Sequence, residues 1–366
     1  MRRETWAIGA LVGVLVAAGV AVGVRVVDNG AFAGPPSIQE NVTAADPGGL
    51  TIQWLGDMML GDAAQKVLAT NGYDWALSQV ASKVAADVVI ANAESPITLS
   101  TEPWGPDKPY SYQASPAAAK AMADAGIDIV SLANNHAMDR GPAGLADTKA
   151  NFEKVGISSF GAGDTIDTAR EPIMIRTKGR TVAVLGFGEY FGRASSASER
   201  RPGVVVMGPQ TIDDGFARAK AAGADDVVAF VHWGDNYQDV NEAQRSMAPL
   251  FAKAGYRMVV GSGPHIVQPI SVVNGMPVVY SLGNFVFGAN GRFTKFNKQG
   301  FGLMATTQFH DDATITMTLR CINTDNDTVA FQPRPCSATQ AADFLPTLNP
   351  GITVKGDVGT LKLPAR

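Results

Sequence analysis

The chain has few of the residues on which thiolate metal sites and redox sites are built. Its 366 residues include only 2 cysteines and 4 histidines. Two thiols are too few for a thiolate metal site, which needs more ligands. Cys321 and Cys336 lie close together in the sequence. In an exported protein such a pair predicts a disulfide, with a reduced pair as the alternative.

Charge is also sparse. Only 17% of the residues are charged and the formal net charge is −4. This balance excludes a general attraction for nucleic acid or another polyanion, so any anionic substrate must be bound by local positive charge. The sequence contains no evident internal repeat or low-complexity tract. With 46% hydrophobic residues the composition is that of a globular protein with a sizeable core.

A long uncharged run lies at the N-terminus. Residues 6–24 form a stretch of 19 uncharged residues after Arg2 and Arg3, enough for a helix of about 28 Å. Positive charge before the run predicts that the N-terminus stays in the cytoplasm while the rest is exported. We therefore expect residues 1–27 to be a signal anchor of a single-pass membrane protein whose bulk is extracytoplasmic. Cleavage after Ala33 is the alternative and would give a secreted protein.

The rest of the chain predicts an α/β fold. Residues 28–48 are polar and rich in glycine and proline, which indicates a linker. From there β-rich runs alternate with helical stretches, as in βαβ units. The expected helices are 63–68, 74–85, 116–125, 142–155 and 242–254.

Two segments break this alternation and predict hairpins, one turning at Lys178-Gly179 and the other at Asn274-Gly275. Parallel strands mixed with hairpins indicate two mixed sheets packed together with helices outside. We assign this domain to residues 49–305. Residues 306–366 are expected to add a strand, at 314–320, and an irregular wrap around the domain that the pair of cysteines holds in place.

Five apolar runs each lead to polar residues that can bind a metal or move a proton. In open α/β sheets ligands bind at the carboxyl ends of the strands, so these residues predict one convergent site. Three of the 4 histidines belong to the set, which favours a metal-assisted hydrolase. Its members are Asp57, Asn92, Glu94, Asn135, His136, His232 and His265.

Each of these residues also has a purely structural interpretation. Asp57 alone could be a helix N-cap, Glu94 a capping or ion-paired carboxylate, and His232 a buried histidine with satisfied hydrogen bonds. The pair Asn135-His136 is harder to explain by packing. An asparagine oxygen can bind a borderline divalent ion while the adjacent histidine stays free for acid–base work, so both are the candidate catalytic residues. We expect His310, beside two aspartates in a turn, to be a surface residue.

Two long polar loops, 98–115 and 191–203, interrupt the βαβ units. Loops of this length are often lids or substrate-binding elements, although a solvated surface loop is an equal alternative. The first loop carries Lys108 and Tyr110, and the second carries three arginines. The weaker candidates for substrate binding are Asn92, Lys108, Tyr110, Arg140, Asp235 and Asn284.

Six short motifs, in this order, resemble those of the capsule-synthesis CapA family, also called poly-γ-glutamate synthesis proteins: GDMMLGD, NAESPIT, LANNHAMDRG, VHWGDNY, GPHIVQPI and YSLGNFVF. The resemblance covers about residues 50–290. That family belongs to the calcineurin-like metallophosphoesterase superfamily. The resemblance implies a four-layer α/β/β/α sandwich, an N-terminal membrane anchor and a metal site across the strand ends.

Carried onto this sequence, the resemblance implies that Asp57 and His265 bind one metal and that Glu94 bridges two. It makes Asn135 and His232 ligands of the second metal and His136 the proton donor to a leaving group. Two departures put the second metal in doubt. Met59 stands where the wider superfamily has a histidine, a loss usual for the CapA family, and Gly263 replaces another.

The sequence thus predicts a protein that serves an anionic capsule polymer such as poly-γ-glutamate, with metal-dependent hydrolytic chemistry. The expected cofactor is one or two divalent ions of Mn, Fe, Zn or Mg. Membrane-bound synthetase or export subunits are expected partners, and nucleic acid is not. Two alternatives remain open: a non-catalytic assembly factor that binds polymer, and an exported phosphatase with another substrate.

Overall fold

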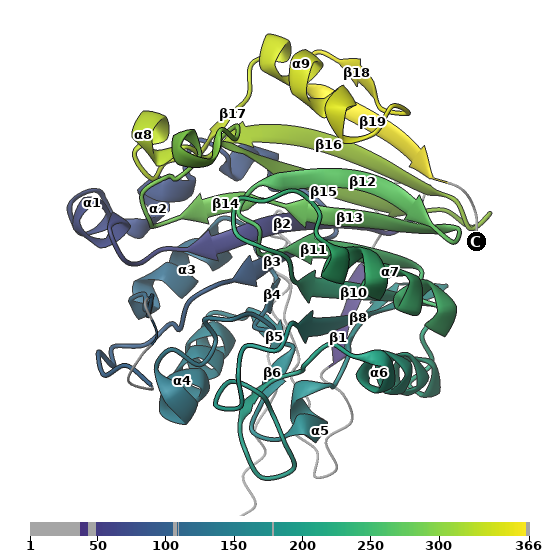
Figure 1. Ribbon diagram of the computed structural model, residues 1–366, viewed down its shortest axis with the longest axis horizontal. Coiled ribbons are helices and arrows are strands. Elements are labelled where there is room, and N and C mark those ends of the chain that lie inside the picture. The colour runs from purple at the N-terminus through teal and green to yellow at the C-terminus, as the bar shows by residue number, and fades with distance from the viewer. Residues whose placement is uncertain (1–36, 43–48, 105–107, 109, 178, 364–366) are drawn as a thin grey trace, which may run out of the picture.

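Two mixed sheets pack face to face, with helices on their outer faces (Figure 1). This is the expected α/β/β/α arrangement. The computed structural model describes residues 37–42, 49–104, 108, 110–177 and 179–363. The expected anchor at residues 1–27 and most of the expected linker lie outside the described residues. Among the helices that are described, none has the length and apolar character to cross a membrane.

The larger sheet has ten strands. Its central part is parallel and consists of β2 (Thr51–Met59), β3 (Val88–Ala93), β4 (Ile129–Ser131) and β5 (Ser158–Phe160). The antiparallel part beside β2 consists of β15 (Phe301–Phe309), β16 (Ile315–Asn323), β17 (Arg334–Pro335), β19 (Val358–Leu363) and β18 (Thr353–Lys355). β14 (Asn284–Phe287) also pairs with β2.

The smaller sheet has seven strands in the order β1 (Ser37–Val42), β7 (Ile173–Thr177), β8 (Arg180–Gly188), β10 (Asp226–His232), β11 (Met258–Ser262), β13 (Met276–Leu282) and β12 (Val267–Val273). Strands β8, β10, β11 and β13 are mutually parallel. A separate ribbon pairs β6 (Ala162–Gly163) with β9 (Gly203–Val204), next to α5 (Ile166–Ala169).

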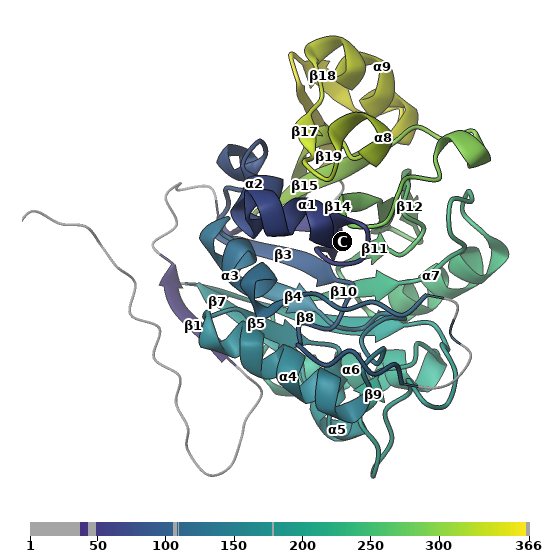
Figure 2. The same ribbon diagram turned by 90° about the vertical axis from the view of Figure 1, so that its left-hand side faces the viewer.

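Helices cover both outer faces (Figures 1 and 2). Those on the larger sheet are α1 (Ala64–Asn71), α2 (Tyr73–Leu77), α3 (Pro116–Asp124) and α4 (Gly141–Lys154), with a 3₁₀ turn, η1 (Ala81–Lys83). On the smaller sheet lie α6 (Pro209–Ala221) and α7 (Glu242–Ala254). The C-terminal part adds α8 (Asn326–Val329) and α9 (Ala338–Leu348), and η2 (Thr294–Phe296) precedes β15.

The two-residue periodicity of the strands builds this layering. Ile52 and Trp54 of β2 point into the core between the sheets, where Trp54 stacks on Phe230 at 6.1 Å between ring centroids. Leu55 and Met58 point the other way, into the core under the helices. Alternating side chains therefore give each strand two apolar faces, as a sheet covered on both sides requires.

Several expected elements are present where the sequence placed them. α7 has the predicted bounds, and α3 and α4 begin or end within a residue of theirs. Both hairpins form: Thr177 pairs with Arg180, and Val273 pairs with Met276. Asn274 and Gly275 both have positive φ, of 48° and 81°, as the expected tight turn demands. α1 runs three residues beyond the predicted end at residue 68.

The predicted helix at 74–85 is wrong in length. It is broken after Leu77, where the Ser78 hydroxyl donates to the Trp75 carbonyl and so competes with the helical pattern. α6 was missed, although Pro209 stands at its first turn, a favoured position for proline.

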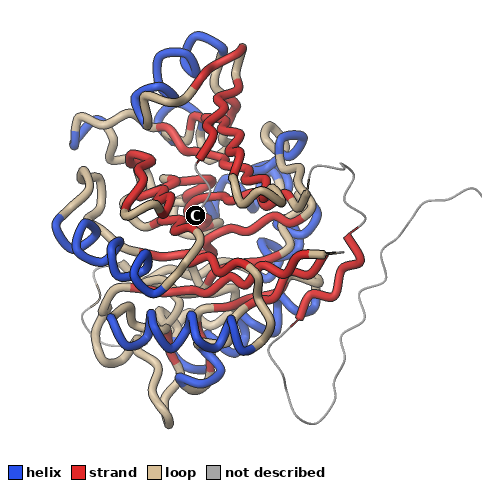
Figure 3. The backbone as a smooth tube through the Cα atoms, turned by 90° about the vertical axis from the view of Figure 1, so that its right-hand side faces the viewer, coloured by secondary structure: helices blue, strands red, loops and turns tan. Residues whose placement is uncertain are grey.

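The C-terminal prediction also needs correction. Residues 306–366 are not an irregular wrap, because α9 and strands β18 and β19 continue the fold at the edge of the larger sheet (Figure 3). The predicted boundary at 305 falls inside β15, which pairs with β2 in the middle of that sheet. The predicted linker is interrupted by β1, which pairs with β7.

Candidate metal and active site

The five polar strand ends converge at one edge of the two sheets. Asp57 lies near the end of β2, and Glu94 directly follows β3. His232 ends β10, and His265 follows β11 across a short turn. A close backbone approach sets the position of Asp57: a Cβ on Gly56 would lie 1.9 Å from the Gly283 carbonyl oxygen, and Asp57 N donates to that oxygen at 2.9 Å. Only glycine at position 56 permits this approach.

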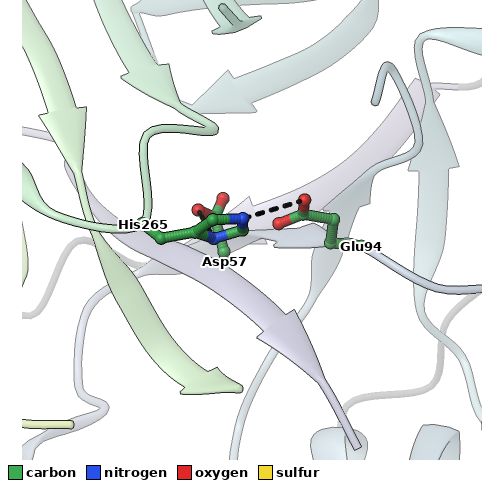
Figure 4. A group of neighbouring side chains, drawn as sticks. All are labelled: Asp57, Glu94 and His265. Carbon is green, nitrogen blue, oxygen red and sulfur yellow. Dashed lines mark ion pairs between the residues drawn. The ribbon is translucent and has the colours of Figure 1, made fainter. Parts of the chain in front are cut away.

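Asp57, Glu94 and His265 form a compact cluster (Figure 4), with one candidate ligand atom from each lying within 4.8 Å of the others. His265 Nδ1 is 3.3 Å from Asp57 Oδ2, and His265 Nε2 is 3.9 Å from Glu94 Oε1. All three side chains are buried. Two carboxylates and an imidazole are a donor set that suits borderline divalent cations.

Glu94 provides the test of whether a metal fits. Its side chain is 0% exposed, and neither carboxylate oxygen has a hydrogen-bond partner among the described residues. Burial, and then the nearby charge of Asp57, raise the pKa of Glu94 well above its usual range. A buried carboxylate without donors is costly unless a cation balances it. The residues therefore fit a divalent cation held between Glu94, Asp57 and His265.

Neighbouring groups fix the orientation of His265. Its Nδ1 lies 3.0 Å from Asn284 Oδ1, an acceptor, so Nδ1 carries the proton and Nε2 keeps its lone pair toward Glu94. The residue has a φ of 60°, in the left-handed region that is uncommon for a residue with a side chain. Backbone strain of this kind is typical of functional sites that the fold holds in place.

Asp57 is held by several donors. Asn92 Nδ2 donates to its Oδ1 at 2.8 Å, and Gly263 N donates to its Oδ2 at 3.2 Å. Burial alone would raise the pKa of Asp57, but His265 and the other neighbouring groups outweigh it, so the pKa lies below its usual value. The Asp57 carboxylate is therefore held in its ionised form, as an anionic metal ligand would need to be.

His232 approaches the same Glu94 oxygen as His265 does. Its Nε2 is 3.7 Å from Glu94 Oε1, and burial lowers its pKa to about 3, which keeps the imidazole neutral as a ligand must be. Asn92 Nδ2 lies 3.2 Å from His232 Nδ1. Asn92 Oδ1 accepts from Asn134, so this amide braces Asp57 and is engaged at both its nitrogen and its oxygen.

Asn135 is half-buried, and its Oδ1 is enclosed without a hydrogen-bond partner in the described part of the chain. Together with the orphaned oxygens of Glu94, this atom is available as a ligand. Its neighbour Asn134, which the sequence analysis did not single out, instead donates to Asn92 and to the Ala93 carbonyl and accepts from His136 N. Of the two consecutive asparagines, Asn134 therefore braces its neighbours by hydrogen bonds, whereas the Asn135 side-chain oxygen has no partner in the described chain.

His136 belongs to a buried dyad. Its Nδ1 lies 2.7 Å from Asp139 Oδ2, so Nδ1 donates and Nε2 is left to exchange a proton. Burial lowers the pKa of His136 to about 4, although the Asp139 carboxylate acts to raise it. Lys108 Nζ donates to Asp139 and, at 2.5 Å, to the Asn135 carbonyl. The Tyr112 ring packs on the imidazole at 4.3 Å between centroids.

The remaining candidates lie outside the cluster. Arg140 donates to Ser111 and holds the loop that carries Lys108. Tyr110 lies farther out and is 44% exposed. Asp235 is exposed and accepts from Asn241, the N-cap of α7, so no contact of the described residues links it to the metal cluster. His310 bonds Thr316 beside the β15–β16 turn, away from the site.

Sequence reasoning missed Asp139 and gave Tyr112, on the 98–115 loop, no individual role in the site. Asp139 follows His136 by three residues, a spacing that brings the two side chains together in a helical turn, and this was the available signal. Tyr112 had no comparable signal. It contacts His136 only because the 98–115 loop folds back, with Tyr112 N donating to Asp139 Oδ2 at 2.6 Å.

The two departures from the superfamily pattern have clear structural counterparts. Met59 packs with Tyr112 and Phe287 in a small apolar cluster, where a histidine would lose its apolar contacts. Gly263 has a φ of +111°, and a Cβ there would lie 2.9 Å from the Trp233 carbonyl oxygen and 3.1 Å from His232 Nε2. Neither position offers a ligand in this chain.

Comparison with known proteins identifies the family that this chain matches. Residues 51–289 match the model of a family described as bacterial capsule synthesis protein. The chain is 36% identical over 242 residues to the PGA biosynthesis protein CapA of Bacillus subtilis (strain 168), covering 65% of this chain and 63% of that protein. It is 31% identical over 253 residues to the capsule biosynthesis protein CapA of Bacillus anthracis, covering 67% and 62% respectively. The matched part thus spans less than two thirds of either relative.

Among solved structures, the NAD nucleotidase of Haemophilus influenzae aligns with a TM-score of 0.47 and 12% sequence identity. The alignment covers 82% of this chain and 62% of that one. A likeness at this level carries no argument about what this chain does.

Proposed function

This chain belongs to the bacterial capsule synthesis protein family, and from that premise we propose that it is a metal-dependent hydrolase. Its substrate would be an anionic surface polymer of the poly-γ-glutamate type, and it would act in the synthesis, export or processing of that polymer. The names of the two Bacillus relatives support the capsule role. The hydrolytic chemistry is argued from the site.

One observation carries the proposal: Glu94 is fully buried, both its oxygens lack hydrogen-bond partners in the described chain, and Oε1 lies 3.7 Å from His232 Nε2 and 3.9 Å from His265 Nε2. A carboxylate held only for structure would be given hydrogen-bond donors within bonding distance. A bound Mn, Fe, Zn or Mg ion accounts for its surroundings. Asp57, Glu94 and His265 would hold one ion, and Asn135 with His232 are the residues left for a second.

A divalent ion bound here would polarise the scissile carbonyl or phosphoryl oxygen. The chain itself supplies the proton transfer. His136 takes a proton at Nε2, since Asp139 fixes the other nitrogen as a donor, and passes it to the leaving group. An anionic substrate beside the imidazole favours its protonated form and so opposes the effect of burial.

We also propose that residues 1–27 anchor the protein in the cytoplasmic membrane with the described domain outside. The uncharged run at 6–24 after Arg2 and Arg3 supports this topology. A protein in that position would meet a polymer as it leaves the cell and would contact membrane-bound synthetase or export subunits.

The test combines metal analysis of the purified full chain with a panel of γ-linked glutamate oligomers and phosphoesters. We expect metal-dependent cleavage of the oligomers. Asp57→Asn and His265→Ala should lose both metal and turnover, whereas His136→Ala should lose turnover and keep its metal. His310→Ala is the matched control outside the site and should behave as the unmodified protein does.

Two results would replace the proposal by one of its alternatives. Tight oligomer binding without turnover at any metal loading would identify a non-catalytic assembly factor. Cleavage of phosphoesters alone would identify a phosphatase with another substrate. Loss of metal in His136→Ala would mean that the roles of the histidines are misassigned.

A further inference from the structure

Arg292 is a half-buried arginine whose charge is not balanced by an ion pair within the described chain. It lies between β14 and β15, and its guanidinium carbon is 4.6 Å from the centroid of the Tyr110 ring. Guanidinium groups stack on aromatic faces and keep their five N–H donors at the edge free for other contacts. Arg292 is thus held in place by an aromatic ring while its donors remain available.

This arginine connects the two sides of the candidate site. The next residue, Phe293, packs on Tyr237 at 5.5 Å between ring centroids, and the Tyr237 ring lies 5.6 Å from that of His265. The Tyr110 ring under its guanidinium lies 6.4 Å from Tyr112, and Tyr112 packs on His136 at 4.3 Å. Arg292 therefore reaches from the metal-ligand side to the proton-transfer side.

The electrostatics agree with this placement. Burial raises the pKa of Tyr237 to about 12, and the charge of Arg292 acts against that rise. Burial likewise raises the pKa of Tyr112, again opposed by Arg292. The charge of Arg292 therefore acts on the two tyrosines that contact His265 and His136.

Lys108, another cation of the described chain near the site, is already engaged. Lys108 forms an ion pair with Asp139 and donates to the Asn135 carbonyl, so its charge is largely matched by a buried carboxylate. The cluster itself contributes the carboxylates Asp57 and Glu94, and the whole chain carries a net charge of −4. An anionic substrate that approaches this edge needs a positive group, and Arg292 is placed to supply it.

We propose that Arg292 binds a carboxylate of the substrate next to the bond that is cleaved, and so selects an acidic polymer. The planar guanidinium presents a fork of donors that matches the two oxygens of a carboxylate. A phosphoryl group could supply the same oxygens, and the experiment separates the two sources. This inference deepens the proposed function and rests on it for the identity of the substrate.

The test measures binding by titration calorimetry with the metal-loaded full chain. The probes are a short γ-linked glutamate oligomer, the same oligomer with its carboxylates amidated, and inorganic phosphate. Arg292→Gln removes the charge, and Arg292→Lys keeps the charge but loses the fork. Arg334→Gln removes an equivalent charge from an exposed arginine of β17 and is the matched control.

We expect Arg292→Gln to weaken binding of the acidic oligomer by about tenfold or more, as expected for a charge-assisted hydrogen bond. Arg292→Lys should fall between Arg292→Gln and the unmodified protein, and Arg334→Gln should bind as the unmodified protein does. The amidated oligomer should bind weakly and equally to every variant. Thermal unfolding should be similar for all of them.

An equal loss for the acidic and the amidated oligomers would overturn the proposal, because Arg292 would then only support the loop. An effect on phosphate without an effect on the oligomer would overturn the carboxylate assignment. Hydrolysis is assayed separately: oligomer binding that depends on Arg292 in a protein without turnover would refute the hydrolase and leave the binding site standing.

Discussion

Burial controls the protonation of His136. Its pKa is lowered to about 4 in the folded protein, first by burial, whereas an unperturbed histidine titrates near pH 6.5. Between these pH values the unfolded chain binds a proton that the folded chain does not. The free energy of unfolding therefore falls as the pH is lowered through this window.

We expect His136→Asn to remove this acid-sensitive contribution, which is on the order of 3 kcal/mol at the acid end of the window. Urea denaturation of metal-free protein, repeated from pH 7.5 down to about pH 4, measures it. The difference between the two proteins should be constant above about pH 7 and should change only below it. Parallel curves over the whole range would show that the imidazole is not kept neutral by the fold.

Gly263 stands where the wider superfamily has a histidine ligand, and the backbone at this position does not accept a side chain without strain. The sequence leaves open whether Gly263→His would increase metal affinity, and the backbone answers the question. With a φ of +111° and a Cβ position 2.9 Å from the Trp233 carbonyl oxygen, any side chain is strained there. The same turn brings Gly263 N to Asp57.

We expect Gly263→Ala to lower the free energy of unfolding by about 2 kcal/mol and to weaken metal binding, since the Asp57 contact is displaced. Gly275→Ala is the matched control, because φ there is +81° but a Cβ would meet no atom within 4 Å. The control should lose less stability and keep its metal affinity. Equal effects in the two variants, measured by urea denaturation and metal titration, would contradict this account.

At the scale of elements, the disulfide ties the C-terminal part to the larger sheet. Cys321 lies in β16, and Cys336, to which it is bonded, follows β17 and precedes α9. Both cysteines are buried in the core between the sheets and α9. The bond therefore secures a segment that also contributes Phe344, packed on Phe301 at 4.9 Å between ring centroids.

Replacing both cysteines by alanine should reduce the free energy of unfolding by about 3 kcal/mol, the value for closing a loop of this length. The metal content should not change, because no candidate ligand lies on these elements. Thiol titration of denatured, unreduced protein should detect no free thiol in the unmodified chain. Two free thiols, or an unchanged stability in the double variant, would remove the role assigned to this bond.

At the scale of the whole molecule, the proposed anchor determines where the protein acts. We expect the full chain to fractionate with membranes, and the domain to be digested by protease added outside intact cytoplasmic membranes. A chain that begins at residue 35 should be soluble and should keep its metal. A soluble species that begins at Gly34 would show instead that the segment is cleaved after Ala33.

The sequence was sufficient wherever a local pattern has a local cause. Apolar, β-rich runs predicted the strands, and the polar residues at their ends marked the site because parallel strands share one edge. Asn274-Gly275 predicted its hairpin, since both residues tolerate positive φ. The α7 bounds followed from Asn241 as N-cap and Gly255 as C-cap, which are local signals at the two ends of a helix.

Tertiary structure alone decided how those pieces act on one another. Asp57 and Gly263 are 206 residues apart, and their hydrogen bond exists because two sheets pack with their strand ends aligned. The pairing of Asp139 with both His136 and Lys108, and the stacking of Arg292 on Tyr110, depend on loops whose paths have no periodic pattern. Sequence periodicity encodes which face of an element is buried, whereas the distances that make a metal site depend on the packing of distant elements.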